Sequence, residues 1–190
     1  MKLQKFIYLP PSCKKELLKI EKTDLIRNLY VYLNKILTYN LITAKSNLIL
    51  KTPKEVWNTK KGHCFELSYF LIACLYLLKR EYKLKINFFY LEQPYLIINK
   101  KWYDHASVLI EFEKEKIIID LGRKIFKARY KKYNKIEGEK ILGNYYIDSA
   151  LSICNKSPKK AKKLLIQGLK LYSKSKRGNF LLKKLKSISG

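Results

Sequence analysis

A nearly uninterrupted apolar run from Phe65 to Leu78 constrains this chain more than any other feature. Only Glu66 and Ser68 interrupt it, so a helix formed by this run is apolar on almost every side. Such a helix is buried inside a domain rather than laid on its surface. The apolar stretch from Leu67 to Leu78 is well short of the roughly 18 residues that a membrane span needs. We therefore expect the central helix of a globular core and no membrane span.

The sequence predicts two helix N-termini here, one before the apolar run and one at its beginning. The segment Thr52-Pro53-Lys54-Glu55 is typical of a helix N-terminus, with a capping threonine, a proline at the first helical position and a glutamate that completes a capping box. That short helix should carry Trp57 and end by Gly62. The buried helix should then begin at about Cys64, directly after the glycine.

The remaining pattern predicts an α+β fold. A helix is expected over residues 17–37, strands over 84–91, 95–98, 106–112 and 116–121, and two further helices over 144–154 and 158–171. The fold class is thus a helical N-terminal part, a central buried helix packed on an antiparallel sheet, and basic C-terminal helices. We expect a catalytic domain over residues 1–143 and a basic helical extension over 144–190.

The charge of the chain is strongly unbalanced. Lys and Arg total 41 against 15 acidic residues, a net charge of +26, and from residue 150 to the end there are twelve basic residues and no acidic one. Lysine-rich segments can neutralise phosphates, which predicts weak polyanion binding by the C-terminal segment. Against this, Lys, Ile, Asn and Tyr are abundant together, as A/T-rich coding produces, and this favours a solvated helix face over a binding site as the explanation of the lysines. Arginine, the usual reader of phosphate and guanine, is scarce.

Cysteine usage indicates a reducing compartment. The four cysteines, Cys13, Cys64, Cys74 and Cys154, form no C-x-x-C pair, and the chain has only two histidines. Neither a zinc site nor a disulfide framework is expected from this pattern. The N-terminal apolar run is too short for a signal peptide. We expect a cytoplasmic protein without metal or cofactor.

Cys64, His105 and Asp120 together indicate nucleophilic catalysis. A cysteine attacks only as thiolate, and a helix N-terminus favours that negative charge. The thiol also needs a base within hydrogen-bond reach, held in turn by a third group. Alone, each residue has an ordinary interpretation: a small core side chain, a histidine at a strand edge and a turn-forming aspartate. Their placement at a helix start and on neighbouring strands favours catalysis.

The register of the expected hairpin decides whether the histidine and aspartate meet. With a two-residue loop at Glu113-Lys114, Ser107 lies opposite Asp120 on the neighbouring strand. His105 is then the diagonal neighbour of Asp120, at about 7 Å between backbones, which the two side chains can span. The alternate residues of both strands form a continuous apolar face.

Three further residues are candidates for the groove or the oxyanion site. Gly62 lets a substrate backbone approach the cysteine. Trp57 and Trp102 are large and near the motifs, as core residues or groove walls, and an indole N–H can donate to an oxyanion. His63, beside the cysteine, is interpreted as structural.

At this point the chain resembles the transglutaminase-like superfamily, the papain-related fold with a Cys-His-Asp triad. The resemblance covers roughly residues 48–123 and rests on the Thr52 helix start, on Gly62-His63-Cys64-Phe65-Glu66, on His105-Ala106-Ser107 and on Ile118-Ile119-Asp120. It implies Cys64 as nucleophile, His105 as general base and acid, and Asp120 as the orienting carboxylate. Ser107 stands where the family often has tryptophan, and Leu121 where it often has proline.

The function that follows is acyl transfer from an amide or thioester to water or an amine. Hydrolysis of a peptide or amide substrate, as by a cysteine protease, is the leading expectation. Gly62-His63-Cys64-Phe65-Glu66 and the end Asp120-Leu121-Gly122 also resemble arylamine N-acetyltransferases, which implies acetyl transfer, although Lys60-Lys61-Gly62 replaces their Arg-Gly-Gly. Two non-catalytic alternatives stay open: a basic module that binds nucleic acid or protein, and a degenerate triad fold that only binds a protein.

Overall fold

The computed structural model describes residues 2–40, 49–98, 101–112 and 115–187, with side chains at all of these except 94–98, 101–104 and 186–187. In chain order the elements are α1 (Leu3–Phe6), α2 (Pro11–Leu17), α3 (Leu25–Ile36), β1 (Thr38–Tyr39), α5 (Pro53–Thr59), β2 (Lys61–Gly62), α6 (Cys64–Tyr82), β3 (Ile86–Ile98), β4 (Lys101–Phe112), β5 (Glu115–Asp120), β6 (Ile125–Phe126), β7 (Asn134–Ile136), α7 (Glu139–Ile153), α8 (Pro158–Leu171) and α9 (Lys176–Ser187).

The chain divides into two units, each with its own packing. The sheet unit consists of Ile7–Asn40 and Lys51–Ile136, and the helical unit of Met1–Phe6, Leu41–Leu50 and Glu137–Gly190. The fold is mixed α+β, with helices and a five-stranded antiparallel sheet. These units do not test the expected division into a catalytic domain and a basic extension, which stays a prediction. Gly143, where we placed that division, lies inside α7.

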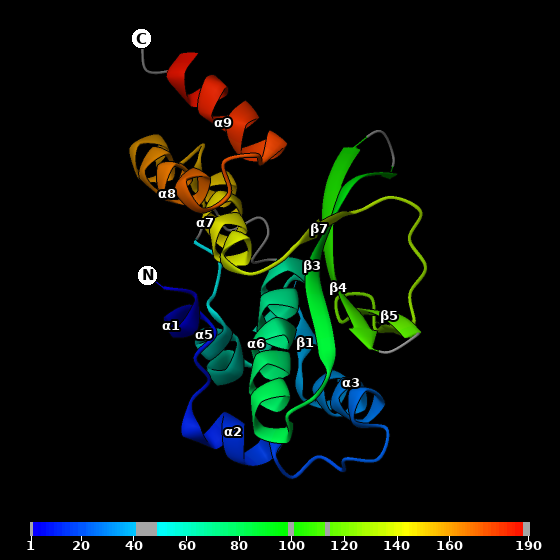
Figure 1. The fold of residues 1–190 in the computed structure, drawn as a ribbon. Helices are drawn as coiled ribbons and strands as arrows, with labels where there is room; N and C mark the ends of the chain where they lie inside the picture. Colours follow the sequence, from blue (N-terminus) through cyan, green and yellow to red (C-terminus); the bar gives the residue numbers. More distant parts are fainter. Residues whose placement is uncertain (1, 41–48, 99–100, 113–114, 188–190) are drawn as a thin grey trace. The chain divides into compact units, whose positions relative to one another are not determined.

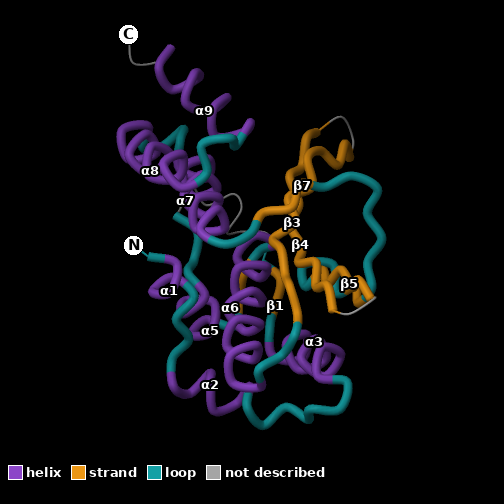
Figure 2. Tube along the Cα trace, in the orientation of Figure 1, coloured by secondary structure: helices purple, strands orange, loops and turns teal. Residues whose placement is uncertain are grey.

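The apolar run forms the buried helix of the sheet unit, as predicted. Helix α6 begins at Cys64 and packs against β3 and β4 of a sheet ordered β6-β5-β4-β3-β7 (Figure 1). Tyr69 stacks on Tyr90 of β3 at 4.7 Å between ring centroids, and Tyr76 meets Phe88 edge-on at 4.6 Å. Helices α2 and α5 pack on α6 from the side away from these strands (Figure 2).

The β4–β5 hairpin has the predicted register. Phe112 pairs with Glu115 and Val108 with Ile119, so the strands are joined through the two residues 113 and 114. The apolar face is as expected, since Val108, Ile110 and Ile119 are fully buried. Two strand limits were wrong. β3 is one strand with a register shift after Gln93 rather than two strands, and β4 begins at Lys101, so His105 lies within its strand rather than at its start.

The prediction of a single helix over residues 17–37 was wrong. The chain forms α2 and α3 there, and Asp24 between them has the left-handed φ of 51°. Asn28 Nδ2 donates to the carbonyl oxygens of Glu21 and Thr23 at 3.3 and 2.6 Å. Such side-chain bonds to the backbone compete with the hydrogen bonds of a helix. This explains why residues 17–37 do not form one continuous helix although their apolar periodicity favours it.

The helical unit is built from α7, α8 and α9. Helix α8 has the predicted bounds, whereas α7 begins at Glu139, five residues before the expected start at 144. Gly168 of α8 lies against Gly143 of α7 so closely that an added Cβ would meet the Gly143 carbonyl oxygen at 2.7 Å. The apolar core of the unit lies among the three helices and contains Ile147, Leu165 and Leu181. None of the helices in the described ranges has the length and apolar character needed to cross a bilayer.

Candidate active site

Local sequence rules determine how the chain enters α6. Thr52 Oγ1 accepts from the Glu55 N–H and the Glu55 carboxylate accepts from the Thr52 N–H, the capping box that the sequence predicted at α5. Lys60 ends α5 in the left-handed conformation, with φ 53°. Residues Lys61 and Gly62 then pair in parallel with β1, and α6 begins two residues later. Short-range interactions thus place Cys64, the candidate nucleophile, at the start of a helix.

His63 is the N-cap of α6, which confirms its structural interpretation. Its Nδ1 accepts from the Phe65 N–H at 3.2 Å, while Glu66 Oε2 accepts from the His63 N–H at 3.1 Å. Glu66 Oε1 also accepts from the Lys51 N–H at 2.8 Å. Burial lowers the pKa of His63 below its ordinary 6.5, against the smaller opposing effect of the Glu66 charge. The imidazole is therefore neutral at neutral pH and keeps Nδ1 free to accept.

Cys64 occupies the first turn of α6 and is 7% exposed. The parallel pairing of Tyr39 with Gly62 brings the Tyr39 side chain beside the cysteine. Burial raises the pKa of Tyr39 to about 12, and the charge of Cys64 and a hydrogen bond between the two side chains act in the same direction. Tyr39 is therefore a protonated phenol over the physiological range and donates to the sulfur.

His105 and Asp120 form a buried pair. His105 Nε2 lies 2.6 Å from Asp120 Oδ2, and the two residues are 7% and 0% exposed. Because a carboxylate only accepts, Nε2 carries the proton in this bond and Nδ1 is left to exchange protons elsewhere. This is the contact that the hairpin register led us to expect, between side chains on neighbouring strands.

Asp120 is held by two further donors. The Arg123 N–H donates to Oδ1 at 2.9 Å, and the Tyr130 hydroxyl donates to Oδ2. Burial, the largest single effect, raises the pKa of Asp120, but the bonds and charge of His105 together with these two donors outweigh it and lower the pKa below its usual 3.8. The carboxylate is therefore ionised at neutral pH although no part of the residue is exposed.

Gly122 has both Cys64 and Asp120 as close neighbours. A Cβ added at Gly122 would lie 3.2 Å from Cys64 Cβ, 3.3 Å from Tyr39 Cε2 and 3.4 Å from Asp120 Oδ1. The cysteine, the phenol and the carboxylate thus all border one point on the turn after β5. The structure brings the helix start, the strand end and the β1 segment together in the sheet unit.

Four residues of this site were not singled out from the sequence: Tyr39, Gln93, Arg123 and Tyr130. Gln93 lies opposite His105 on β3, and its Nε2 donates to Ser107 Oγ at 3.3 Å. It also forms a hydrogen bond with the Tyr130 side chain. Burial and the bond to Asp120 raise the pKa of Tyr130 to about 12. No sequence motif marks these residues, because each reaches the site through a strand pairing or a loop path.

The expected groove residues have other contacts. The Trp57 indole N–H donates to Ser12 Oγ at 3.1 Å, and the ring lies 6.4 Å from that of Phe70, a core contact rather than a role toward an oxyanion. A Cβ at Gly62 would meet Leu67 Cδ2 at 3.1 Å, so the glycine is explained by the close approach of the first turn of α6. The side chain of Trp102 lies outside the described residues.

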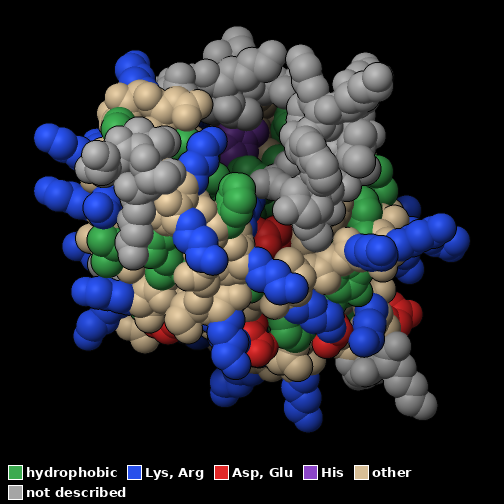
Figure 3. All heavy atoms as spheres, turned by 90° about the horizontal axis from the view of Figure 1, so that it is seen from above, with side chains coloured by type: hydrophobic (Ala, Val, Ile, Leu, Met, Phe, Trp, Pro, Cys, Tyr) green, Lys and Arg blue, Asp and Glu red, His purple; other side chains and the backbone are tan. Residues whose placement is uncertain are grey.

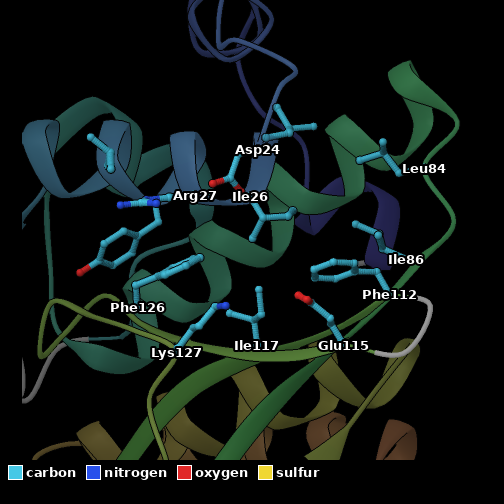
Figure 4. A pocket seen from close by; sticks show the side chains of 13 residues that line it. Asp24, Ile26, Arg27, Leu84, Ile86, Phe112, Glu115, Ile117, Phe126 and Lys127 are labelled. Atoms are coloured by element: carbon cyan, nitrogen blue, oxygen red, sulfur yellow. The ribbon is translucent and has the colours of Figure 1, made fainter.

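The sheet unit also contains a pocket that lies apart from these residues. No group of three His, Cys, Asp or Glu side chains in the described ranges could hold a metal ion. A pocket of about 660 Å³ lies between α3 and the sheet, where Phe112 and Phe126 face the same space (Figure 4). None of the predicted catalytic residues lines it. Its lining includes acidic and basic side chains, Asp24 and Glu115 with Arg27 and Lys127, so the charge indicates no ligand class.

Comparisons with known protein families, curated proteins and solved structures identified no relative of this chain. No protein-family model matches the chain, and neither the curated proteins nor the solved structures gave a significant match.

Proposed function

We propose that this chain is a transglutaminase-like cysteine enzyme that attacks an amide carbonyl and transfers the acyl group, with hydrolysis as by a cysteine protease or amidase as its main reaction. The observation that carries the proposal is that the Cys64 side chain and the Asp120 carboxylate border the same point at Gly122, while His105 is bonded to that carboxylate. Nucleophilic catalysis by cysteine requires a base held by a third group within reach of the thiol, and the shared neighbourhood of Cys64 and Asp120 at Gly122 supports that arrangement.

The reaction proceeds in two balanced halves. His105 Nδ1 takes the proton of the Cys64 thiol, the sulfur bonds to the carbonyl carbon, and the C=O electron pair moves to oxygen. When the tetrahedral intermediate collapses, the C–N bond breaks and the leaving amine takes the proton from His105, which leaves a thioester on Cys64. Water then attacks the thioester with His105 as base, releasing a carboxylic acid and restoring the thiol. With an amine in place of water, the same steps transfer the acyl group.

Electrostatics in the site favour this course. The N-terminal end of α6 carries the positive end of the helix dipole, which stabilises both the thiolate and the oxyanion. Asp120, ionised by its three donors, keeps His105 in the tautomer with the proton on Nε2 and stabilises the imidazolium. Tyr39, protonated over the physiological range, supplies a further donor at the sulfur.

Cysteine alkylation tests the thiolate. At about pH 6, stoichiometric iodoacetamide should label Cys64 first, because an unassisted thiol with a pKa near 8.5 is protonated there. Cys154, which is partly exposed, is the matched competitor, whereas burial raises the pKa of the Cys74 thiol. Replacing His105 with Gln should reduce labelling of Cys64 to the rate of Cys154. Equal labelling of all four cysteines, or an unchanged rate in the variant, would refute the thiolate.

Substrate turnover tests the enzyme claim separately. A library of fluorogenic peptide amides should be cleaved by the wild type and by Cys154→Ser, and not by Cys64→Ser. Loss of general acid–base help in His105→Gln should lower the rate by about 10²–10⁴-fold. Acetyl transfer from an acetyl thioester to an arylamine without amide cleavage would instead favour the acetyltransferase alternative.

A further inference from the structure

The outer face of α8 is a row of lysines around one apolar side chain. Lys159, Lys163, Ile166 and Lys170 follow the spacing that places residues on one side of a helix. All four are exposed, and Ile166 is 42% exposed although it is a large apolar residue. Leu165, on the other side of the helix, is fully buried in the core of the helical unit.

Helix α9 repeats this arrangement. Lys176, Phe180 and Lys183 share a face by the same spacing, and Phe180 is 71% exposed. Leu181 and Leu185 are buried in the same core as the inner face of α8. Each helix therefore uses its apolar stripe for folding and still presents one large apolar side chain to solvent among lysines.

Helices α8 and α9 contain no acidic residue that could serve as a counter-charge to these lysines. No acidic residue follows Asp148 in the sequence, and Asp148 is paired with Arg177. Within the described part of the chain, no ion pair involves the lysines of the two outer faces: Lys159, Lys163, Lys170, Lys176 and Lys183. Lys and Arg side chains also far outnumber acidic ones on the surface drawn in Figure 3.

We propose that the lysine faces of α8 and α9 bind the surface of an anionic lipid bilayer, with Ile166 and Phe180 entering the boundary between headgroups and acyl chains. A surface of positive charge complements anionic headgroups, and clustered lysines on amphipathic helices are sufficient for this attraction. The apolar side chains add burial that a purely electrostatic contact lacks. This interaction is independent of the reaction proposed for Cys64.

The apolar residues favour lipid over nucleic acid. Proteins that bind single strands stack bases on aromatic rings, and Phe180 could do so, but Ile166 has no ring face. Both side chains can enter a bilayer. Lysine is also a point charge that suits headgroups as well as phosphates, whereas geometric readout of nucleic acids relies on arginine, of which α8 and α9 contain only Arg177.

Vesicle co-sedimentation of the full chain tests the proposal. Vesicles of phosphatidylcholine with phosphatidylserine should bind the protein, and vesicles of phosphatidylcholine alone should not. The double variant Lys163→Glu with Lys183→Glu should bind at least about 25-fold more weakly, from about fivefold for each lysine. Lys35→Glu with Lys85→Glu, which makes the same charge change at exposed positions of the sheet unit, should bind almost as the wild type does.

The apolar contribution is tested by Ile166→Ser and Phe180→Ser, each of which should weaken binding by about threefold or more at constant charge. Circular dichroism checks that every variant is folded. If these two variants bind like the wild type, or if the control variant loses as much affinity as the lysine variant, the proposal is wrong. Stronger binding to a single-stranded oligonucleotide than to anionic vesicles, at the same ionic strength, would also overturn it.

Discussion

His105 Nε2 lies 2.6 Å from Asp120 Oδ2, and neither residue is more than 7% exposed. A buried carboxylate persists in its ionised form only when donors replace the water it has lost. Here Arg123 and Tyr130 supply those donors beside the imidazole. The pair is thus a fixed structural unit before any substrate arrives, and its properties can be tested without a known substrate.

Substitution of Gly122 should change the reactivity of Cys64 more than it changes the stability of the protein. In Gly122→Ala the new Cβ would meet Cys64 Cβ at 3.2 Å and Asp120 Oδ1 at 3.4 Å. These contacts are tight but not prohibitive, so we expect a loss of about 1 kcal/mol in the free energy of unfolding, the lower end of the cost of overpacking. Because the methyl group stands between nucleophile and carboxylate, alkylation of Cys64 should slow severalfold.

Gly138→Ala is the matched control for that substitution. Gly138 has a positive φ of 55°, and a Cβ there meets nothing within 4 Å. Alanine should therefore cost about 1–3 kcal/mol through backbone strain, while the alkylation rate stays unchanged. Equal alkylation rates in both variants would contradict the placement of Cys64 beside Gly122.

Removing the Tyr130 hydroxyl should weaken the protein in a pH-dependent way. The pKa of Asp120 is lowered in the folded state, so its contribution to stability is present above the unfolded value near 3.8 and is lost as pH falls through the folded value. Tyr130→Phe removes one donor to the carboxylate and should cost about 1.5 kcal/mol at neutral pH. Urea titrations between about pH 7 and pH 3 should show this difference shrinking as Asp120 is protonated. A loss that is the same at every pH would assign the effect to packing instead.

His63 should make the protein less stable below neutral pH. Burial lowers its folded pKa below 6.5, so the unfolded chain takes up the proton first and stability falls as pH drops from about 7 to 5. Protonation also removes the Nδ1 acceptor that caps Phe65. In His63→Asn the cap is kept and the titration is lost, so the urea midpoint should vary less over this range. Every other titratable group is the same in both proteins, so the difference between their slopes reports on His63; identical slopes would contradict the prediction.

The crossing of α7 and α8 should tolerate no side chain at Gly168. A Cβ there would meet the Gly143 carbonyl oxygen at 2.7 Å and Ile147 Cγ1 at 2.8 Å, and the oxygen belongs to rigid helix backbone. Alanine in a helix normally stabilises relative to glycine by about 0.5–1 kcal/mol. Gly168→Ala should instead destabilise the helical unit by about 1–3 kcal/mol. Thermal unfolding checks the sign, and Gln167→Ala at the exposed neighbouring position should be neutral or stabilising.

The sequence alone determined the local frame of the site. The capping box at Thr52, the start of α6 at Cys64 and the two-residue connection of the β4–β5 hairpin follow from rules that act over a few residues. Alternation in a strand then placed His105 and Asp120 where their side chains meet. These features could be predicted because caps and strand periodicity depend on neighbours in the chain.

Only the tertiary structure decided which other residues surround Cys64, His105 and Asp120. Tyr39 reaches Cys64 through the parallel pairing of β1 with β2, and Tyr130 reaches Asp120 along the loop after β6, contacts that no periodicity encodes. The break at Asp24 has a local cause instead: Asn28 bonds to backbone oxygens five and seven residues earlier, which apolar spacing does not report. Local propensity determines whether a segment forms a helix or a strand. Which distant residues contact that segment depends on the path of the chain, because packing of the whole core sets that path.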